Sequence, residues 1–193
     1  MLVSALKFGH QLLAEVIVSG DTVVDATVGN GYDTLFLAKL VGKQGKVIGF
    51  DIQPQAIEIT KQKLLEQHLS CQTRLYLKGH EKIQDVLTNE ERIKGAVFNL
   101  GYLPKGDKQI ITQGKTTITA LSTLMDHLEK GGRIVMVIYY GHPGGEQEKE
   151  TVLDFVKAIP QEEFNVLNYQ FINQKNSPPI LICIEKKLRK NNP

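Results

Sequence analysis

Short hydrophobic runs alternate with helical patterns along most of the chain. Apolar residues recur at three- and four-residue steps over 2–19, which predicts an amphipathic helix. Runs typical of buried strands follow at 22–26, 46–51, 73–78, 95–99 and 133–139. Helices are predicted between them, from Asp33 or Thr34 onward and over 54–68, 82–87, 116–129 and 146–158. The glycine- and proline-containing segment 100–115 is predicted to be a loop.

Five alternations of strand and helix predict a parallel, doubly wound α/β sheet. Two further strands, predicted at 164–171 and 180–185, follow one another without a helix between them. Only antiparallel neighbours can be joined by a short loop. We therefore expect a single domain over 1–193. Its seven-stranded sheet should be mostly parallel, with one antiparallel strand at or near an edge.

Composition limits the class of protein only broadly. The 193 residues, 41% of them hydrophobic, suffice for one sizeable core. A net charge of +2 is compatible with a nucleic-acid partner without arguing for one. Cys71 and Cys183 are expected to be buried thiols in a reducing cell. With no leader, no long apolar segment and no metal-ligand spacing, we expect a soluble cytoplasmic protein without a membrane contact or a metal.

The stretch from Val23 to Thr34 carries the first candidate site. A β-branched run ends in Asp25, a glycine-rich turn follows, and a helical pattern begins at once, as in nucleotide-binding α/β proteins. A dinucleotide-binding loop has a third glycine where this chain has Thr34. Asp25 can instead accept hydrogen bonds from loop amides or from an ammonium group. S-adenosylmethionine has that ammonium and no phosphate, so the pattern favours it over NAD.

Polar residues after the next two strands suit the rest of a nucleoside. Asp51 ends the second strand twenty residues after Gly31, where an acid meets ribose hydroxyls. Gln53 is within reach of the adenosine edge, and His80-Glu81 follows the third strand, where such folds hold the adenine. A loop histidine with no ligand role fits His80 as well. The other histidines in helical patterns, His10, His68 and His127, are expected to be surface or packing residues.

The fourth strand ends in a candidate substrate motif, Asn99-Leu100-Gly101-Tyr102-Leu103-Pro104. Enzymes that methylate the amino groups of nucleic-acid bases commonly have Asp/Asn/Ser-Pro-Pro-Tyr/Phe here. The polar residue accepts hydrogen bonds from the target amine, and the aromatic ring stacks on the base. Asn99 and Tyr102 keep this spacing, whereas Leu100 and Gly101 replace both prolines. The alternative is that Asn99 only caps the loop.

The fifth strand ends in a second aromatic segment, Tyr139-Tyr140-Gly141-His142. Its tyrosines are either a platform for a base or ordinary strand-end residues. The groups near the strand ends that could take a proton from an amine are Tyr102, Asp107, Tyr139 and His142. Basic side chains that could meet phosphates are Lys105, Lys108, Lys115, Lys175 and the run 186–190, with a solvated tail as the alternative for that run.

Several segments together resemble the small bacterial methyltransferases once labelled putative rRNA methylases. They are DATVGNGYDT, GFDIQPQAI, GHE, FNLGYLPKGDK, TTITAL and YYGHPGG, and the resemblance spans about 5–185. It implies a Rossmann-like class I S-adenosylmethionine-dependent methyltransferase. It further implies that 5-aminomethyl-2-thiouridine at the tRNA wobble position is methylated, with the anticodon stem-loop as partner. Two alternative functions stay open: an rRNA or small-molecule N-methyltransferase, and an NAD-linked or non-catalytic Rossmann-type protein. Assembly as a homodimer also stays open.

These arguments define two sets of site residues. The predicted cofactor-binding residues are Asp25, Thr27, Gly29, Asn30, Gly31, Asp33, Thr34, Asp51, Gln53, His80, Glu81 and Asn99. The predicted catalytic residues are Asn99, Tyr102, Tyr139 and His142.

Overall fold

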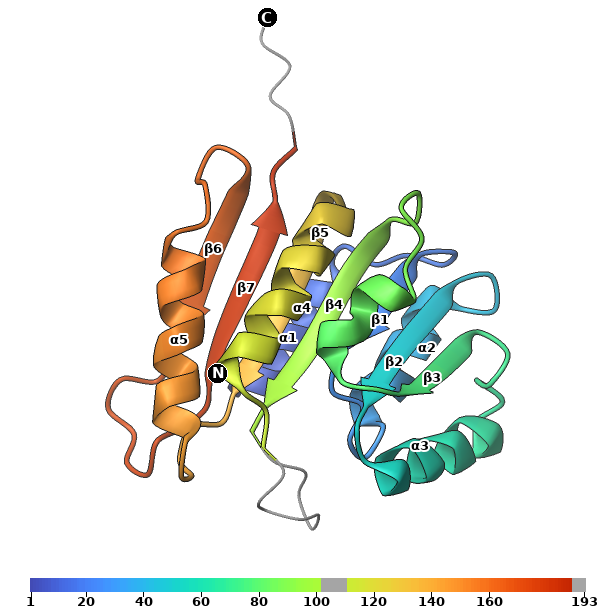
Figure 1. Cartoon of the computed structure of the whole chain (residues 1–193), viewed down its shortest axis with the longest axis horizontal. Helices are drawn as coiled ribbons and strands as arrows, with labels where there is room; N and C mark the ends of the chain where they lie inside the picture. Colours follow the sequence, from blue (N-terminus) through green and yellow to red (C-terminus); the bar gives the residue numbers. More distant parts are fainter. Residues whose placement is uncertain (102–110, 189–193) are drawn as a thin grey trace, which may run out of the picture.

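Seven strands form one sheet in the order β3-β2-β1-β4-β5-β7-β6 in a computed structural model that describes residues 1–101 and 111–188 (Figure 1). The strands are β1 (Thr22–Asp25), β2 (Lys46–Asp51), β3 (Thr73–Leu77), β4 (Ile93–Leu100), β5 (Leu128–Ile138), β6 (Phe164–Tyr169) and β7 (Ile180–Lys186). The helices are α1 (Ala5–Ala14), α2 (Tyr32–Val41), α3 (Pro54–Glu66), the 3₁₀ helix η1 (His80–Asp85), α4 (Gly114–His127) and α5 (Gly145–Lys157).

The strand directions confirm the predicted fold class. Strands β1 to β5 pair in parallel, and β7 pairs antiparallel with both β5 and β6, one place in from the edge. The chain moves outward from β1 to β3 and then returns to β4 on the other side of β1. In open α/β sheets, ligands bind at such a reversal, in a crevice beyond the carboxyl ends of the strands. Here these are the ends of β1 and β4, at the bottom of the view in Figure 1, and we refer to this place as the crevice.

Helices cover both faces of the sheet and bury two cores. Side chains of α1, α2 and α3 pack on one face, with Leu13 and Leu37 fully buried. Side chains of α4, α5 and η1 pack on the other face, which contains Phe50 and Phe98. At Gly9, a Cβ atom would lie 2.8 Å from Val135 Cγ1, so α1 sits closely against the sheet. The packing therefore fixes α1 relative to the strand ends.

Two predicted helices differ from the observed ones. The helix expected over 2–19 ends at Ala14, because Val18 N donates to Asp21 Oδ2 (2.7 Å) in a turn that replaces the last helical residues. The helix expected over 82–87 is a 3₁₀ helix that begins earlier, at His80. Helix propensity does not contain the first effect, since it depends on the side chain of Asp21, outside the helix.

Two further predictions are wrong, the start of β5 and the burial of Cys71. β5 begins at Leu128 instead of Arg133, because Leu128 pairs with Ile93 before an irregularity in the ladder. Both cysteines are free thiols; Cys183 is buried as expected, whereas Cys71 is exposed. Cys71 precedes β3, an edge strand, and so faces solvent.

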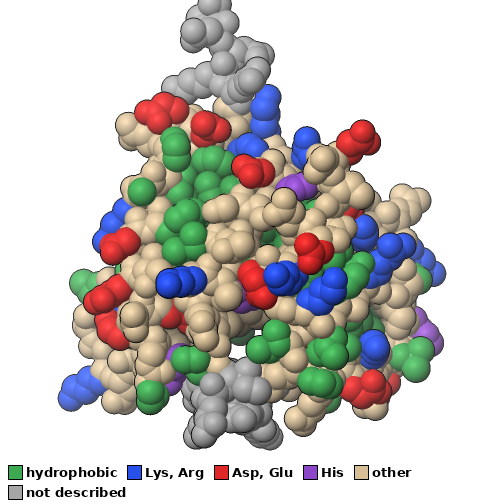
Figure 2. All heavy atoms as spheres, in the orientation of Figure 1, with side chains coloured by type: hydrophobic (Ala, Val, Ile, Leu, Met, Phe, Trp, Pro, Cys, Tyr) green, Lys and Arg blue, Asp and Glu red, His purple; other side chains and the backbone are tan. Residues whose placement is uncertain are grey.

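The surface mixes charges of both signs. On the face drawn in Figure 2, Lys and Arg side chains are interspersed with Asp and Glu side chains. No helix within residues 1–101 and 111–188 is long and apolar enough to cross a membrane.

Candidate active site

The loop between β1 and α2 has the backbone shape that its glycines predict. Gly29 and Gly31 have φ angles of 51° and 79°, in the left-handed region that favours glycine. A Cβ atom on Gly31 would lie 2.5 Å from Thr60 Oγ1, so a larger residue has no room there. Gly31 N donates to the Val28 carbonyl (2.8 Å), and α2 begins at the next residue. The loop therefore turns tightly, with its backbone near the crevice.

Asp25 ends β1 beneath this loop and is fully buried. Its carboxylate accepts hydrogen bonds from Thr27 N (3.2 Å) and from the Thr34 hydroxyl (2.6 Å). Burial, together with the nearby negative charges of Asp33 and Asp51, raises the pKa of Asp25 to about 7 against the lowering effect of these hydrogen bonds. A buried acid beside two others favours a positively charged ligand.

Asp51 joins the end of β2 to the same loop. One carboxylate oxygen accepts from Gly29 N (2.8 Å), and the other accepts from Gln53 N (2.9 Å) at the start of α3. Burial raises the pKa of Asp51. The structure thus brings Asp51 and Gln53 next to the glycine loop, as the prediction requires, while Asn30 faces α3 and its carbonyl accepts from Lys63 Nζ (2.7 Å).

His80 is buried at the start of η1 and has one ring nitrogen without a protein partner. Nδ1 lies 3.1 Å from the Ala26 carbonyl oxygen and donates to it, which leaves Nε2 as an acceptor. Burial lowers the pKa of His80, so the ring is neutral. Nε2 is buried and no residue of the described chain bonds to it. Because buried polar atoms are rarely left unpaired, this nitrogen is a candidate acceptor for a hydrogen bond from a ligand. Glu81 follows in the same turn.

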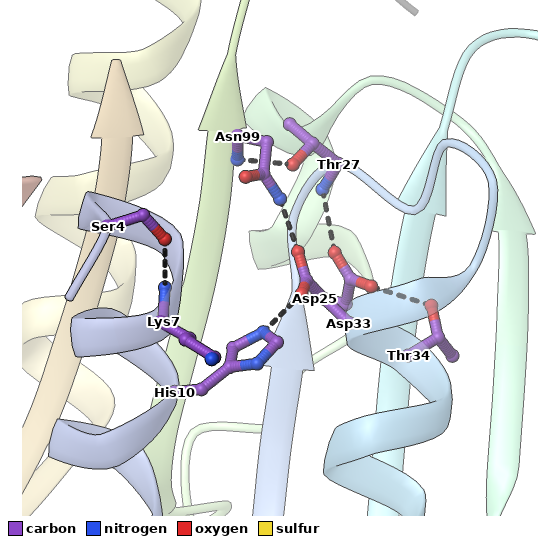
Figure 3. Close-up of polar contacts among 8 residues, drawn as sticks. All are labelled: Ser4, Lys7, His10, Asp25, Thr27, Asp33, Thr34 and Asn99. Carbon is purple, nitrogen blue, oxygen red and sulfur yellow. Dashed lines mark hydrogen bonds and ion pairs between the residues drawn. The ribbon is translucent and has the colours of Figure 1, made fainter. Parts of the chain in front are cut away.

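Asn99, at the end of β4, connects the fourth strand to the glycine loop. Its backbone N donates to Thr27 Oγ1 (2.7 Å), and its side-chain nitrogen donates to Asp33 Oδ2. Figure 3 shows the Asn99 amide oxygen turned away from Asp33. A carboxylate can only accept hydrogen bonds, so it selects this orientation of the amide. Asp33, predicted as a cofactor residue, therefore lies against the predicted catalytic asparagine.

His10 completes this chain of contacts and was missed by the sequence analysis. Its Nε2 donates to Asp33 Oδ1 at 2.5 Å (Figure 3). Its ring stacks on Phe36, with the two centroids 4.0 Å apart. The expectation of a surface or packing residue is therefore incomplete, because His10 also has a polar partner in the crevice. No local motif links α1 to α2, so only the tertiary packing shows this pair.

The turn after β5 lies against the end of β4. Tyr139 N donates to the Leu100 carbonyl (2.9 Å), and burial, together with the charge of Asp33, raises the pKa of the Tyr139 hydroxyl. Tyr140 instead packs against α5, where Lys149 Nζ lies 4.1 Å from its ring centroid. His142 Nδ1 lies 3.0 Å from the Pro143 carbonyl oxygen and donates to it. Tyr139 is thus the tyrosine that shares the crevice with Asp33.

A buried acid on α5 supports the same region and was also missed. Gly101 N donates to Thr112 Oγ1 (2.8 Å), and this hydroxyl donates to Glu148 Oε2 (2.7 Å). Thr117 Oγ1 donates to Glu148 Oε1 (3.3 Å), and burial raises the pKa of Glu148. Glu148 therefore fixes the residues on both sides of the segment 102–110.

Other predicted residues lie elsewhere or outside the described chain. The structure does not describe residues 102–110, which include Tyr102, Lys105, Asp107 and Lys108. It also does not describe residues 189 and 190 of the basic tail. Lys186 and Lys187 donate to the carbonyls of Met125 and Gln161, so these two lysines contact the protein itself. Within residues 1–101 and 111–188, no three His, Cys, Asp or Glu side chains are grouped to hold a metal ion.

Comparisons with known proteins identify the family of this chain. The family model described as "Putative rRNA methylase" matches residues 47–185. The chain is 37% identical over 192 residues to the chloroplastic tRNA (mnm(5)s(2)U34)-methyltransferase of Arabidopsis thaliana, which covers 95% of this chain and 70% of the relative.

Two solved structures are similar over nearly their whole length. A putative rRNA-methylase from Clostridium thermocellum is 48% identical with a TM-score of 0.94, covering 96% of this chain and 99% of that one. SMU.1697c from Streptococcus mutans, a putative methyltransferase solved in complex with SAH, is 42% identical with a TM-score of 0.88 and the same coverage. The chain therefore belongs to the putative rRNA methylase family of class I S-adenosylmethionine-dependent methyltransferases, which confirms the predicted fold, family and cofactor.

Proposed function

We propose that the protein methylates the amine of 5-aminomethyl-2-thiouridine at the wobble position of tRNA, giving 5-methylaminomethyl-2-thiouridine. The nucleoside is supported by the plant relative, whose name specifies it and whose identity of 37% extends over 95% of this chain. The amine acceptor is supported by one observation in the crevice, the Asn99 amide whose oxygen is turned away from Asp33.

The donor set at the ends of β1, β2 and β3 fits S-adenosylmethionine. The buried carboxylate of Asp25, with the amides of the glycine loop, would hold the positively charged methionine part. Asp51 would accept from the ribose hydroxyls, with Gln53 beside it. His80 Nε2, which has no hydrogen-bond partner in the described chain, would accept a hydrogen bond from the exocyclic amine of adenine. When bound, the cofactor supplies an activated methyl group on a sulfonium.

The acceptor side of the crevice would orient the amine for attack. Asn99 Oδ1 would accept an N–H from the amine, which directs the nitrogen lone pair along the line of displacement. The cofactor would supply the methyl carbon for a new N–C bond to that lone pair, and its sulfur would keep the electrons of the broken S–C bond. An alkylamine has a pKa of about 10, so it must lose a proton before it attacks. Asn99 orients but is not a base. His142 is the described candidate for that proton, because the raised pKa of Tyr139 keeps its hydroxyl protonated.

The test uses purified protein, S-adenosylmethionine and a synthetic anticodon stem-loop that carries 5-aminomethyl-2-thiouridine. We expect one methyl group to be added, measured by mass spectrometry of the digested nucleosides. The same stem-loop with plain 2-thiouridine is the control and should stay unmodified. If the aminomethyl stem-loop is unchanged while rRNA is methylated, the tRNA proposal is wrong and the rRNA alternative holds. Nucleoside analysis of a deletion strain repeats the test in cells: an unchanged level of methylaminomethyl-thiouridine contradicts the proposal.

A further inference from the structure

We propose that His10 is a positioning residue for methyl transfer, acting through Asp33 to hold the Asn99 amide oxygen toward the acceptor amine. This inference rests on the proposed amine methylation and assigns the residue that supports its acceptor side. His10 lies on α1, far from the glycine loop and the end of β4 in sequence. The three side chains nevertheless form one continuous chain of hydrogen bonds across α1, α2 and β4 (Figure 3).

Asp33 is the centre of this chain, and each of its oxygens has one donor. Oδ1 accepts from His10 Nε2 (2.5 Å) and Oδ2 accepts from the Asn99 side chain. The Asp33 side chain is only 8% exposed, so water does little to solvate it. A buried carboxylate that loses one donor rotates or moves to find another. His10 therefore determines where the second oxygen of Asp33 points.

The orientation of the Asn99 amide matters because its two ends have opposite hydrogen-bonding character. With the nitrogen held by Asp33, the oxygen is left to accept an N–H from the substrate. A flipped amide would present N–H donors instead, and these would bond to the lone pair that must attack the methyl group. The terminal amide torsion has broad, roughly two-fold preferences, so the side chain alone does not choose between the two states.

The position of His10 is itself well determined. Its ring stacks on Phe36 with an interplanar angle of 10°, and its side chain is 27% exposed. One residue earlier, Gly9 lets α1 pack directly on Val135 and Leu181. The N-terminal side of α1 is tied down by Tyr169, whose hydroxyl donates to the Val3 carbonyl (2.8 Å). The imidazole is thus a donor at a fixed place, which a solvent molecule would not be.

The first experiment compares the variants His10→Ala, His10→Gln and Gln11→Ala with the wild type. Gln11 is the exposed neighbour on α1 and serves as the matched control. We expect kcat for the aminomethyl stem-loop to fall about tenfold in His10→Ala, with KM and the Kd for S-adenosylmethionine changed by less than about twofold. His10→Gln, which can donate from its amide, should recover part of the loss, and Gln11→Ala should behave as wild type. A rise in KM or Kd with unchanged kcat overturns the proposal.

A double-mutant cycle then asks whether His10 acts through Asn99. If it does, His10→Ala should add nothing to the loss caused by Asn99→Ala, because the amide that His10 orients is already gone. Losses that multiply in the double variant would show independent roles and overturn the proposal.

A readout without catalysis separates this inference from the proposed function. The side-chain ¹⁵N resonance of Asn99, assigned by its disappearance in Asn99→Ala, should shift or broaden in His10→Ala and stay in place in Gln11→Ala. An unmoved resonance overturns the role of His10 whatever the substrate is. Failure of the wild type to methylate the aminomethyl stem-loop instead overturns the proposed function, and the resonance still decides the role of His10.

Discussion

The two halves of the crevice are built from contacts of different range. At the ends of β1 and β2, Asp25 accepts from Thr27, two residues away, and Asp51 accepts from Gln53, also two residues away. At the end of β4, the backbone and side chain of Asn99 bond to residues 72 and 66 positions away. The cofactor half therefore combines such short-range bonds with two longer ones, from Gly29 N to Asp51 and between His80 and the Ala26 carbonyl. In the acceptor half, both bonds of Asn99 depend on the packing of elements far apart in sequence. Changes in the two halves should separate cofactor binding from methyl transfer.

Replacing Asp51 by alanine should have the largest effect, a loss of affinity for S-adenosylmethionine. The variant loses the carboxylate proposed to bind the ribose and also releases Gly29 N and Gln53 N. Hydrogen bonds to charged groups contribute about 1.5–3 kcal/mol each, so the Kd for S-adenosylmethionine should rise about 100-fold or more. Isothermal titration calorimetry measures it, with circular dichroism to show that the variant is folded.

Replacing Asn99 by alanine should slow methyl transfer without weakening cofactor binding. Cofactor binding should be kept, because the backbone N of residue 99 still donates to Thr27. The amine loses its orienting oxygen, so kcat should fall about 100-fold in single-turnover assays. Equal loss of cofactor binding in Asn99→Ala and Asp51→Ala would mean that the two halves are not separable in this way.

The pH dependence of cofactor binding sharpens the description of the cofactor half. The pKa of Asp25 is raised to about 7 by burial, so the carboxyl is neutral below this pH and negatively charged above it. Affinity for the positively charged cofactor should fall about 3- to 10-fold from pH 8 to pH 6, and Asp25→Asn should remove most of this change. A wild-type affinity that is flat over this range would contradict the prediction.

The stability of the unliganded protein should respond to pH in the opposite direction. Asp25 has an ordinary pKa of 3.8 when the chain is unfolded and about 7 when it is folded. Between these values the folded state binds the extra proton, so this group's contribution to stability falls as the pH rises through that window. Urea unfolding of the wild type and Asp25→Asn at several pH values isolates the contribution.

The smallest effect is expected for Glu148→Gln on the acceptor side. The variant keeps the shape of the side chain but weakens its bonds to Thr112 and Thr117. The free energy of unfolding should fall by about 1–2 kcal/mol, with little change in the Kd for S-adenosylmethionine. Urea unfolding measures this, and the exposed neighbour Glu150→Gln is the control. A loss of cofactor affinity as large as the loss of stability would contradict the division between the halves.

The sequence predicts the local parts of the molecule well. β2 has the predicted bounds, Lys46–Asp51, because a hydrophobic run between a glycine and a proline has few alternatives. Asp25 and Asp51 are recognisable because their distance from the glycine loop reflects a strand–loop–helix unit of nearly constant length. One partner of each, Thr27 N for Asp25 and Gln53 N for Asp51, is a backbone amide two residues away, so the pattern contains this part of the geometry.

The residues that the sequence does not reveal have partners on other elements. His10 is 23 positions from Asp33, and Glu148 is 36 positions from Thr112, so each pair exists only after helices dock on the sheet. Within its own helix, each of these residues resembles an ordinary polar residue. The end of α1 was mispredicted for a related reason, since Asp21, outside the helix, bonds to Val18 N and forms the turn. Tertiary structure supplies this information, and helical periodicity does not.

The docking of α1 also has a consequence for protein synthesis. This helix precedes all seven strands of the sheet along the chain, yet it packs on β5 and β7, which are synthesised well after it. Arg133 of β5 donates to the Leu12 carbonyl (2.8 Å), and Gly9 lies against Leu181 of β7. During translation, α1 cannot dock on the sheet until β5 and β7 have left the ribosome. A nascent chain that stops before β7 thus lacks part of the surface on which α1 packs.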